Sequence, residues 1–147
     1  EIKNPIKVAK ALKQLSEEMS LASVCNCRFT VSNRPVKIQV EGYACGDAQK
    51  LVARFTLEQQ TGCCGALVST DTFVAQGHRK GGIAQAFMPL KEAIAKELGY
   101  STLVATVDLT NNKAEEHILL KFGWTKAWEF TNDRTDNKVG FFLKNLK

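Results

Sequence analysis

A pair of adjacent glycines behind two basic residues is the part of the sequence best suited to chemistry. Gly81 and Gly82 follow Arg79 and Lys80, and an apolar helical repeat begins directly after them at Ile83. Without side chains, such a turn lets an anion reach the unpaired amide groups of the first helical turn. The helix dipole and the two cationic side chains favour a phosphate there. The pattern therefore predicts a phosphate-binding turn.

Two common nucleotide-binding motifs do not fit this turn. It lacks the Gly-Lys-Ser/Thr ending of a nucleoside-triphosphate loop. It also lacks the third spaced glycine and the later acidic residue of a dinucleotide-binding fingerprint. A turn that serves only the fold is the simpler alternative, and the glycines alone do not exclude it.

The elements that position this turn follow from the hydrophobic pattern. Helical spacing predicts helices over residues 5–20, 83–98 and 112–122. Alternation predicts a hairpin of 28–31 and 36–41, then strands over 51–57, 64–74, 102–107, 124–130 and 139–143, with 42–50 read as a loop. No repeat, low-complexity tract or linker divides residues 1–147, so one mixed α/β domain is expected.

Composition and charge limit the class of protein. Of the 147 residues, 44% are hydrophobic and 24% charged, as in ordinary globular domains. No apolar run reaches the roughly 18 residues that a membrane-spanning helix requires, so no membrane span is expected. The net charge of +5 suits anionic partners. The lysines, Lys91 among them, are scattered like those of a solvated surface, so a nucleic-acid binder is kept only as a disfavoured alternative.

The cysteines bear on compartment and metal binding. Their number is five, and an odd number argues against a secreted disulfide framework and for a cytoplasmic protein with reduced thiols. Cys25-x-Cys27 and Cys63-Cys64 lack the spacing of common zinc sites. No metal is therefore expected.

Two segments together resemble the signature of the GNAT acetyltransferase superfamily. Residues 73–84 read as a strand that ends in Val, followed by Arg-x-x-Gly-x-Ala at the start of a helix. Residues 112–124 are similar to the second family motif, a helix that begins at Asn and ends at Gly and an aromatic residue. The resemblance covers residues 64–130. It implies a mostly antiparallel sheet flanked by helices and splayed between the strand ending near Val74 and the strand 102–107.

The resemblance implies an acetyl-CoA-dependent N-acetyltransferase. Backbone groups of Phe73 and Val74 would pair with the pantetheine arm of the cofactor. The N–H groups from Arg79 to Ala84 would hold its pyrophosphate, and Asn112 would contact it as well as cap a helix. The acyl group would pass to a primary amine of a small molecule or a protein, while the N–H of Val74 stabilises the oxyanion.

The catalytic acid and base depart from the family pattern. The usual acid is a Tyr four residues before the closing Gly, and Leu119 occupies that position without a proton to donate. This departure keeps open an alternative in which the chain binds CoA with weak or no turnover. For the base, Asp71 and Ser69 are expected on one face of the strand that ends at Val74. Other carboxylates, Glu41, Glu58, Glu115 and Glu116, are alternatives, and the choice of base stays open. Assembly into a homodimer is left open.

Overall fold

Seven strands form one sheet, and three α-helices lie on it, in a computed structural model that describes residues 2–19, 21, 24–63, 65–79 and 82–147. In chain order the elements are α1 (Pro5–Glu17), β1 (Val24–Asn33), β2 (Val36–Ala44), β3 (Asp47–Gln59), β4 (Ala66–Val74), the 3₁₀ turn η1 (Gln76–His78), α2 (Ile83–Glu97), β5 (Thr102–Asp108), α3 (Lys113–Lys121), β6 (Thr125–Thr131) and β7 (Lys138–Asn145).

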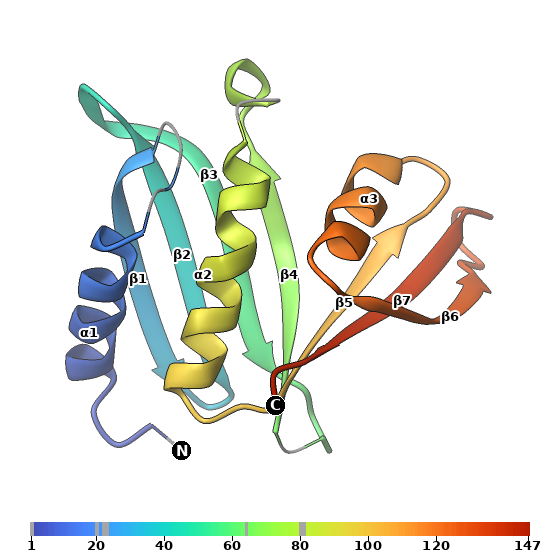
Figure 1. The fold of residues 1–147 in the computed structure, drawn as a ribbon, viewed down its shortest axis with the longest axis horizontal. Coiled ribbons are helices and arrows are strands. Elements are labelled where there is room, and N and C mark those ends of the chain that lie inside the picture. The colour runs from blue at the N-terminus through green and yellow to red at the C-terminus, as the bar shows by residue number, and fades with distance from the viewer. Residues whose placement is uncertain (1, 20, 22–23, 64, 80–81) are drawn as a thin grey trace.

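The sheet is antiparallel except at one pair of neighbouring strands. Its order is β1-β2-β3-β4-β5-β7-β6, and only β4 and β5 run parallel. Their pairing extends from Ala66 opposite Thr102 to Ser69 opposite Ala105 and then stops. Beyond that point β4 stays with β3 and β5 stays with β7, so the sheet opens as a V (Figure 1). The predicted fold class and the predicted splay are both confirmed.

All three helices cover the same face of the sheet (Figure 1). The crossovers from β4 through α2 to β5 and from β5 through α3 to β6 advance in one direction, and right-handed crossovers then place both helices on one side. Side chains connect α2 to its neighbours. Lys121 Nζ of α3 donates to Gln85 Oε1 at 2.9 Å, and Lys144 of β7 lies 3.6 Å from Glu92. Within the described residues, no helix has the length and apolar character needed to cross a membrane.

The hydrophobic core lies between this helical layer and the sheet. Phe55 of β3, Phe87 of α2 and Phe142 of β7 are fully buried, and the rings of Phe55 and Phe87 lie 4.9 Å apart. Full burial of such a side chain stabilises the fold by roughly 2 kcal/mol. Ile83 at the start of α2 is also buried. The core therefore fixes where α2 begins, next to the end of β4.

Most predicted elements are confirmed, but the loop predicted over residues 42–50 is wrong. Strand β2 continues to Ala44 and β3 already begins at Asp47, so only a tight turn separates them. Gly46 makes this turn with φ 84°, a conformation that glycine adopts without strain. Residues 47–50 are exposed, so they do not show the alternation of a half-buried strand.

The cysteines also differ from expectation. Cys25 at the start of β1 and Cys45 in the turn after β2 form a disulfide bond, so the prediction of reduced thiols does not hold for this pair. Cys27 is free and buried, and burial raises the pKa of its thiol to about 11 although the nearby charge of Lys13 lowers it. Cys63 is free and exposed.

Candidate functional site

Helix α2 begins at a glycine, which has no side chain to cap the first turn. Gly82 is the N-cap residue with φ 84°, and among the described residues no side-chain cap bonds to the first turn. A side chain at Gly82 would meet no described atom within 4 Å at its Cβ position. The backbone of Ile83 and Ala84 forms the first turn behind it. This geometry suits an anion, because helix N-termini present amide hydrogens and partial positive charge.

Arg79 connects this turn to the end of β4. Its Nε donates a hydrogen bond to the carbonyl oxygen of Val74 at 3.1 Å, while the side chain as a whole is exposed. The terminal guanidinium nitrogens stay available for a phosphate. Three predicted residues, Val74, Arg79 and Gly82, thus lie along one short path from strand to helix. Lys80 and Gly81, which belong to the same prediction, lie outside the described residues.

The backbone of Val74 points away from β3. Val74 and Ala53 are opposite each other, and Ala75 N donates to Val52 O at 2.7 Å, which makes the Val74 pair one that exchanges no hydrogen bonds. The carbonyl and the N–H of Val74 therefore both point toward the splay. Phe73 is paired with Arg54 of β3, so its backbone faces the opposite way.

Ser69 and Asp71 are not arranged as the alternation predicted. Ser69 lies at the fork of the V, opposite both Leu57 of β3 and Ala105 of β5. Between Ser69 and Phe73 the register of β4 against β3 shifts, and Asp71 has a left-handed φ of 55°. An extra residue of this kind is a β-bulge, and it breaks the alternation from which a common face was expected.

The carboxylate of Asp71 is engaged by a neighbouring strand. Its Oδ2 lies 3.3 Å from Arg54 Nε, and both side chains are about half exposed. The guanidinium of Arg54 also lies over the ring of Phe73, 5.0 Å from its centroid. Arg54 was not selected from the sequence. A basic residue within an otherwise apolar strand was the only signal for it.

Asn112 caps α3 as predicted. Its Oδ1 accepts a hydrogen bond from Glu115 N at 3.2 Å, and its own N–H donates to Asp108 O at 2.8 Å. The residue is exposed at the N-terminal end of α3, the helix that follows β5. Its contact with a cofactor stays a prediction.

Sequence reasoning missed the most unusual side chain near the splay, Lys91. It lies on α2 with 2% of its surface exposed, and its Nζ donates to Thr72 Oγ1 of β4 at 3.3 Å. Nζ also lies 5.1 Å from the ring centroid of Phe55. Burial lowers the pKa of Lys91 to about 8, although the negative charge of Glu115 on α3 raises it. Lys91 follows Phe87 by four residues within the buried stripe of α2, and this spacing was the signal that could have revealed it.

The helix on the other side of the V presents an apolar side chain where the family pattern has a tyrosine. Leu119 is 1% exposed and belongs to the hydrophobic core. Glu115 precedes it by one helical turn, so both residues lie on the same face of α3. The electrostatic interaction of Glu115 with Lys91 therefore relates this face to α2 across the V.

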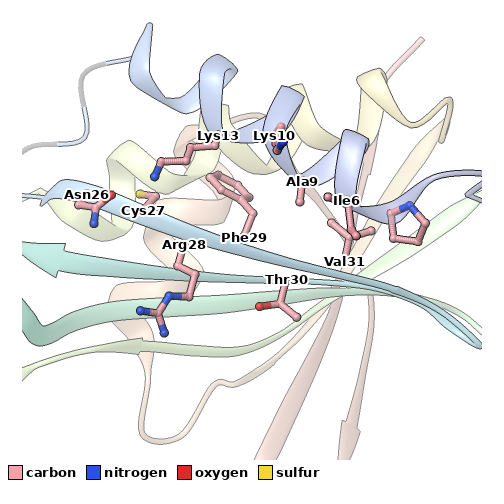
Figure 2. Close-up of a pocket in the computed structure, with 11 residues that line it drawn as sticks. Ile6, Ala9, Lys10, Lys13, Asn26, Cys27, Arg28, Phe29, Thr30 and Val31 are labelled. Atoms are coloured by element: carbon pink, nitrogen blue, oxygen red, sulfur yellow. The ribbon is translucent and has the colours of Figure 1, made fainter.

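A separate groove of about 560 Å³ lies between α1 and β1 (Figure 2). Cys27, Phe29 and Val31 point from β1 toward the helix, while Lys10 and Lys13 border the groove from α1. Strand β1 is the edge of the sheet, and β2 and β3 separate it from β4. The groove is therefore not part of the site at the V.

Comparison with solved structures supports this architecture. The fold is similar to nourseothricin acetyltransferase, with a TM-score of 0.64 and 17% identity over 100% of this chain and 96% of the other. An acetyltransferase of the GNAT family from Streptococcus pneumoniae matches with a TM-score of 0.64 and 14% identity, over 76% and 67%. Spermidine N-acetyltransferase from Vibrio cholerae, solved with CoA and spermine, matches with a TM-score of 0.62 and 15% identity, over 75% and 66%.

The fold is that of the GNAT acetyltransferases. No protein-family model matches the sequence, and no curated protein is significantly similar to it, so the likeness lies in the three-dimensional structure. The neighbours share the mixed α/β architecture, a mostly antiparallel sheet flanked by helices.

Proposed function

We propose that the chain is an acetyl-CoA-dependent N-acetyltransferase that moves the acetyl group to a primary amine by direct attack. One observation carries this proposal: the parallel pairing of β4 and β5 ends at Ser69 and Ala105, and the open N-terminus of α2 lies at the far end of β4. An extended arm that pairs with β4 inside the V would place its diphosphate at that helix N-terminus.

The residues at the helix N-terminus fit a diphosphate. Within the described residues, the side-chain position of Gly82 is open and no side chain caps the first turn, so amide donors are available beside the exposed guanidinium of Arg79. In the proposal Ile83 and Ala84 contribute amide donors. Lys80 and Gly81, outside the described residues, are proposed to belong to the same phosphate site, and Asn112 is proposed to contact the cofactor from the other side of the V.

Three groups of the chain are assigned to the acyl transfer, for which acetyl-CoA supplies an activated acyl group as a thioester. The N–H of Val74 donates to the carbonyl oxygen as negative charge develops there. Asp71 is the proposed base that removes a proton from the attacking amine, because an amine near pKa 10 is mostly protonated at neutral pH. Ser69, at the fork, is the proposed hydrogen-bond partner at the reacting end.

The proposed acceptor is a primary amine on a small molecule or a protein. Two structural neighbours are named for acetylation of nourseothricin and of spermidine, and the second is solved with spermine. A carboxylate within reach of the reaction suits an amine, which arrives as a cation. Asp71 is about half exposed and meets this requirement in the proposal.

A second candidate function is CoA binding with little turnover. Leu119 favours it, since a fully buried leucine takes the position of the family's proton donor. The two candidates differ in a simple measurement. Both require CoA to bind, but only the first requires thiol release in the presence of an amine.

The test compares two glycines in the same backbone conformation. Gly82 and Gly46 both have φ 84° and open space at the position of a Cβ, so an Asp causes similar strain at either site. We expect Gly82→Asp to abolish detectable CoA binding in calorimetry and thiol release from acetyl-CoA with an amine panel. Gly46→Asp, in the turn before β3, should leave both unchanged. Wild-type protein that binds no CoA would refute the proposal.

A further inference from the structure

Lys91 places a buried ammonium group beside the inner wall of the V. Its Nζ contacts the hydroxyl of Thr72, which is two residues before Val74 on β4. Thr72 itself is exposed, so the buried ammonium contacts a residue of β4 that reaches the surface. An apolar side chain of similar length would pack at this position without the cost of burying a charge. A functional reason for the lysine is therefore worth seeking.

The position of Lys91 matches the reacting end of an arm bound along β4. The phosphates would bind at Gly82, where β4 has ended, and the arm would extend into the V until the thioester carbonyl meets the N–H of Val74. Thr72 lies two residues from Val74 along β4, toward the fork of the V. The thioester would thus come to the wall on which Thr72 and Lys91 lie.

Helix α3, on the other side of the V, contributes no proton donor at the position of Leu119. Leu119 is a buried apolar residue, and Glu115 one turn earlier is a carboxylate whose charge raises the pKa of Lys91. We propose that Lys91 of α2 donates the proton that the departing CoA sulfur requires, because Leu119 of α3 has no proton to donate. This inference rests on the proposed function.

The step is balanced in protons and electrons. The amine nitrogen forms a bond to the carbonyl carbon, and the carbon–sulfur bond breaks with its electron pair left on sulfur. Lys91 Nζ gives a proton to the sulfur, so CoA leaves as a thiol and the lysine becomes neutral. The proton lost from the amine returns through solvent to Lys91. The net products are the amide and CoA.

The charged groups around Lys91 set the pH at which it works. Glu115 of α3 favours the ammonium form, whereas β3 and β4 contribute the uncharged Phe55 and Thr72. On α2 itself, the neighbouring Glu92 is paired with Lys144 of β7. With a pKa of about 8, Lys91 is protonated at neutral pH and yields its proton readily, as an efficient general acid should.

A first experiment needs no amine acceptor. The thiol pKa of bound CoA is measured from the pH dependence of thiolate absorbance in wild type, Lys91→Met and Lys96→Met. Lys96 is an exposed lysine on the same helix and serves as the matched control. We expect the ammonium of Lys91 to lower the thiol pKa of bound CoA by about one unit relative to free CoA. Lys96→Met should behave as wild type, and Lys91→Met should abolish the shift.

A second experiment follows turnover with the best amine of the panel. Wild-type kcat should fall as pH rises through about 8, because Lys91 must be protonated to act. Lys91→Met should lower kcat at neutral pH by about 100-fold and remove this descending limb. Leu119→Tyr in the Lys91→Met background should restore at least part of the activity, since it supplies a proton donor from the facing helix.

The outcomes separate the inference from the function on which it rests. If wild type binds no CoA, the proposed function fails and the inference falls with it. If Lys91→Met binds CoA like wild type and leaves both the thiol pKa and kcat unchanged, the inference alone is overturned. Calorimetry of CoA binding to each variant shows that it is folded.

Discussion

Arg79 and Val74 are joined by a hydrogen bond of 3.1 Å from the guanidinium Nε to the carbonyl oxygen. This bond ties the turn before α2 to the last residue of β4. It also occupies the carbonyl on the side of Val74 that faces the V, so the N–H of the same residue keeps its direction toward the V. Arg79 therefore orients the strand end and offers charge to a phosphate with one side chain.

The first prediction concerns this double role. Arg79→Gln removes the charge and the Nε donor, so the dissociation constant for CoA should rise about tenfold, or about 1.4 kcal/mol. Arg34→Gln removes the same charge from the turn between β1 and β2 and is the control. Calorimetry at one fixed salt concentration compares the two. Equal affinities of both variants would contradict a specific role of Arg79.

The second prediction concerns the proposed base. Asp71→Asn keeps a residue type that tolerates a positive φ, so the backbone should stay as it is. Loss of the exposed ion pair with Arg54 should cost less than about 1 kcal/mol of stability. The kcat for amine acetylation should fall by about 100-fold. Asp136→Asn, at φ 59°, is the matched substitution, and a similar kcat in both variants would exclude Asp71 as the base.

The third prediction concerns the stability cost of Lys91. The folded pKa of about 8 lies below the ordinary value of 10.5, so the unfolded chain binds more protons between these two pH values. The contribution of Lys91 to the free energy of unfolding of the wild type therefore rises with pH across that window. Lys91→Met avoids burying the charge and should raise the free energy of unfolding at pH 7 by about 1–3 kcal/mol.

Urea unfolding of both proteins at pH 7 and pH 10 checks this prediction. The advantage of Lys91→Met should be largest at pH 7 and should shrink at pH 10, where the wild-type lysine is mostly neutral when folded. A variant that is less stable than wild type at pH 7 would show that the contacts to Thr72 and Phe55 outweigh the cost of burial.

The fourth prediction concerns the disulfide between Cys25 and Cys45, which are 20 residues apart. Cross-linking a loop of this length should stabilise the fold by about 3 kcal/mol through the unfolded chain. Replacing both cysteines with Ser should lower the melting temperature, as should a reductant on wild type. Cys63→Ser, at an exposed free thiol, should change neither the melting temperature nor its response to a reductant. A melting temperature insensitive to reductant would contradict the prediction.

The sequence by itself determined most of the elements and the glycine at which α2 begins. These signals are the helical periodicity, the strand alternation and the Gly81-Gly82 pair. They depend on residues that are close in the sequence, so they can be recognised without a tertiary structure. The same local logic placed Asn112 as a helix cap. The resemblance of residues 64–130 to one superfamily then predicted the splay that the strand pairing confirmed.

Only the tertiary structure decided which side chains meet at the V. The bulge at Asp71 and its contact with Arg54 depend on the register between two strands, which local patterns do not encode. Lys91 is buried because α2 turns that position toward β3 and β4. From the sequence alone, a lysine is expected on the surface. The cysteine pairing has the same origin, since β1 and β2 bring together two residues that are distant in the chain.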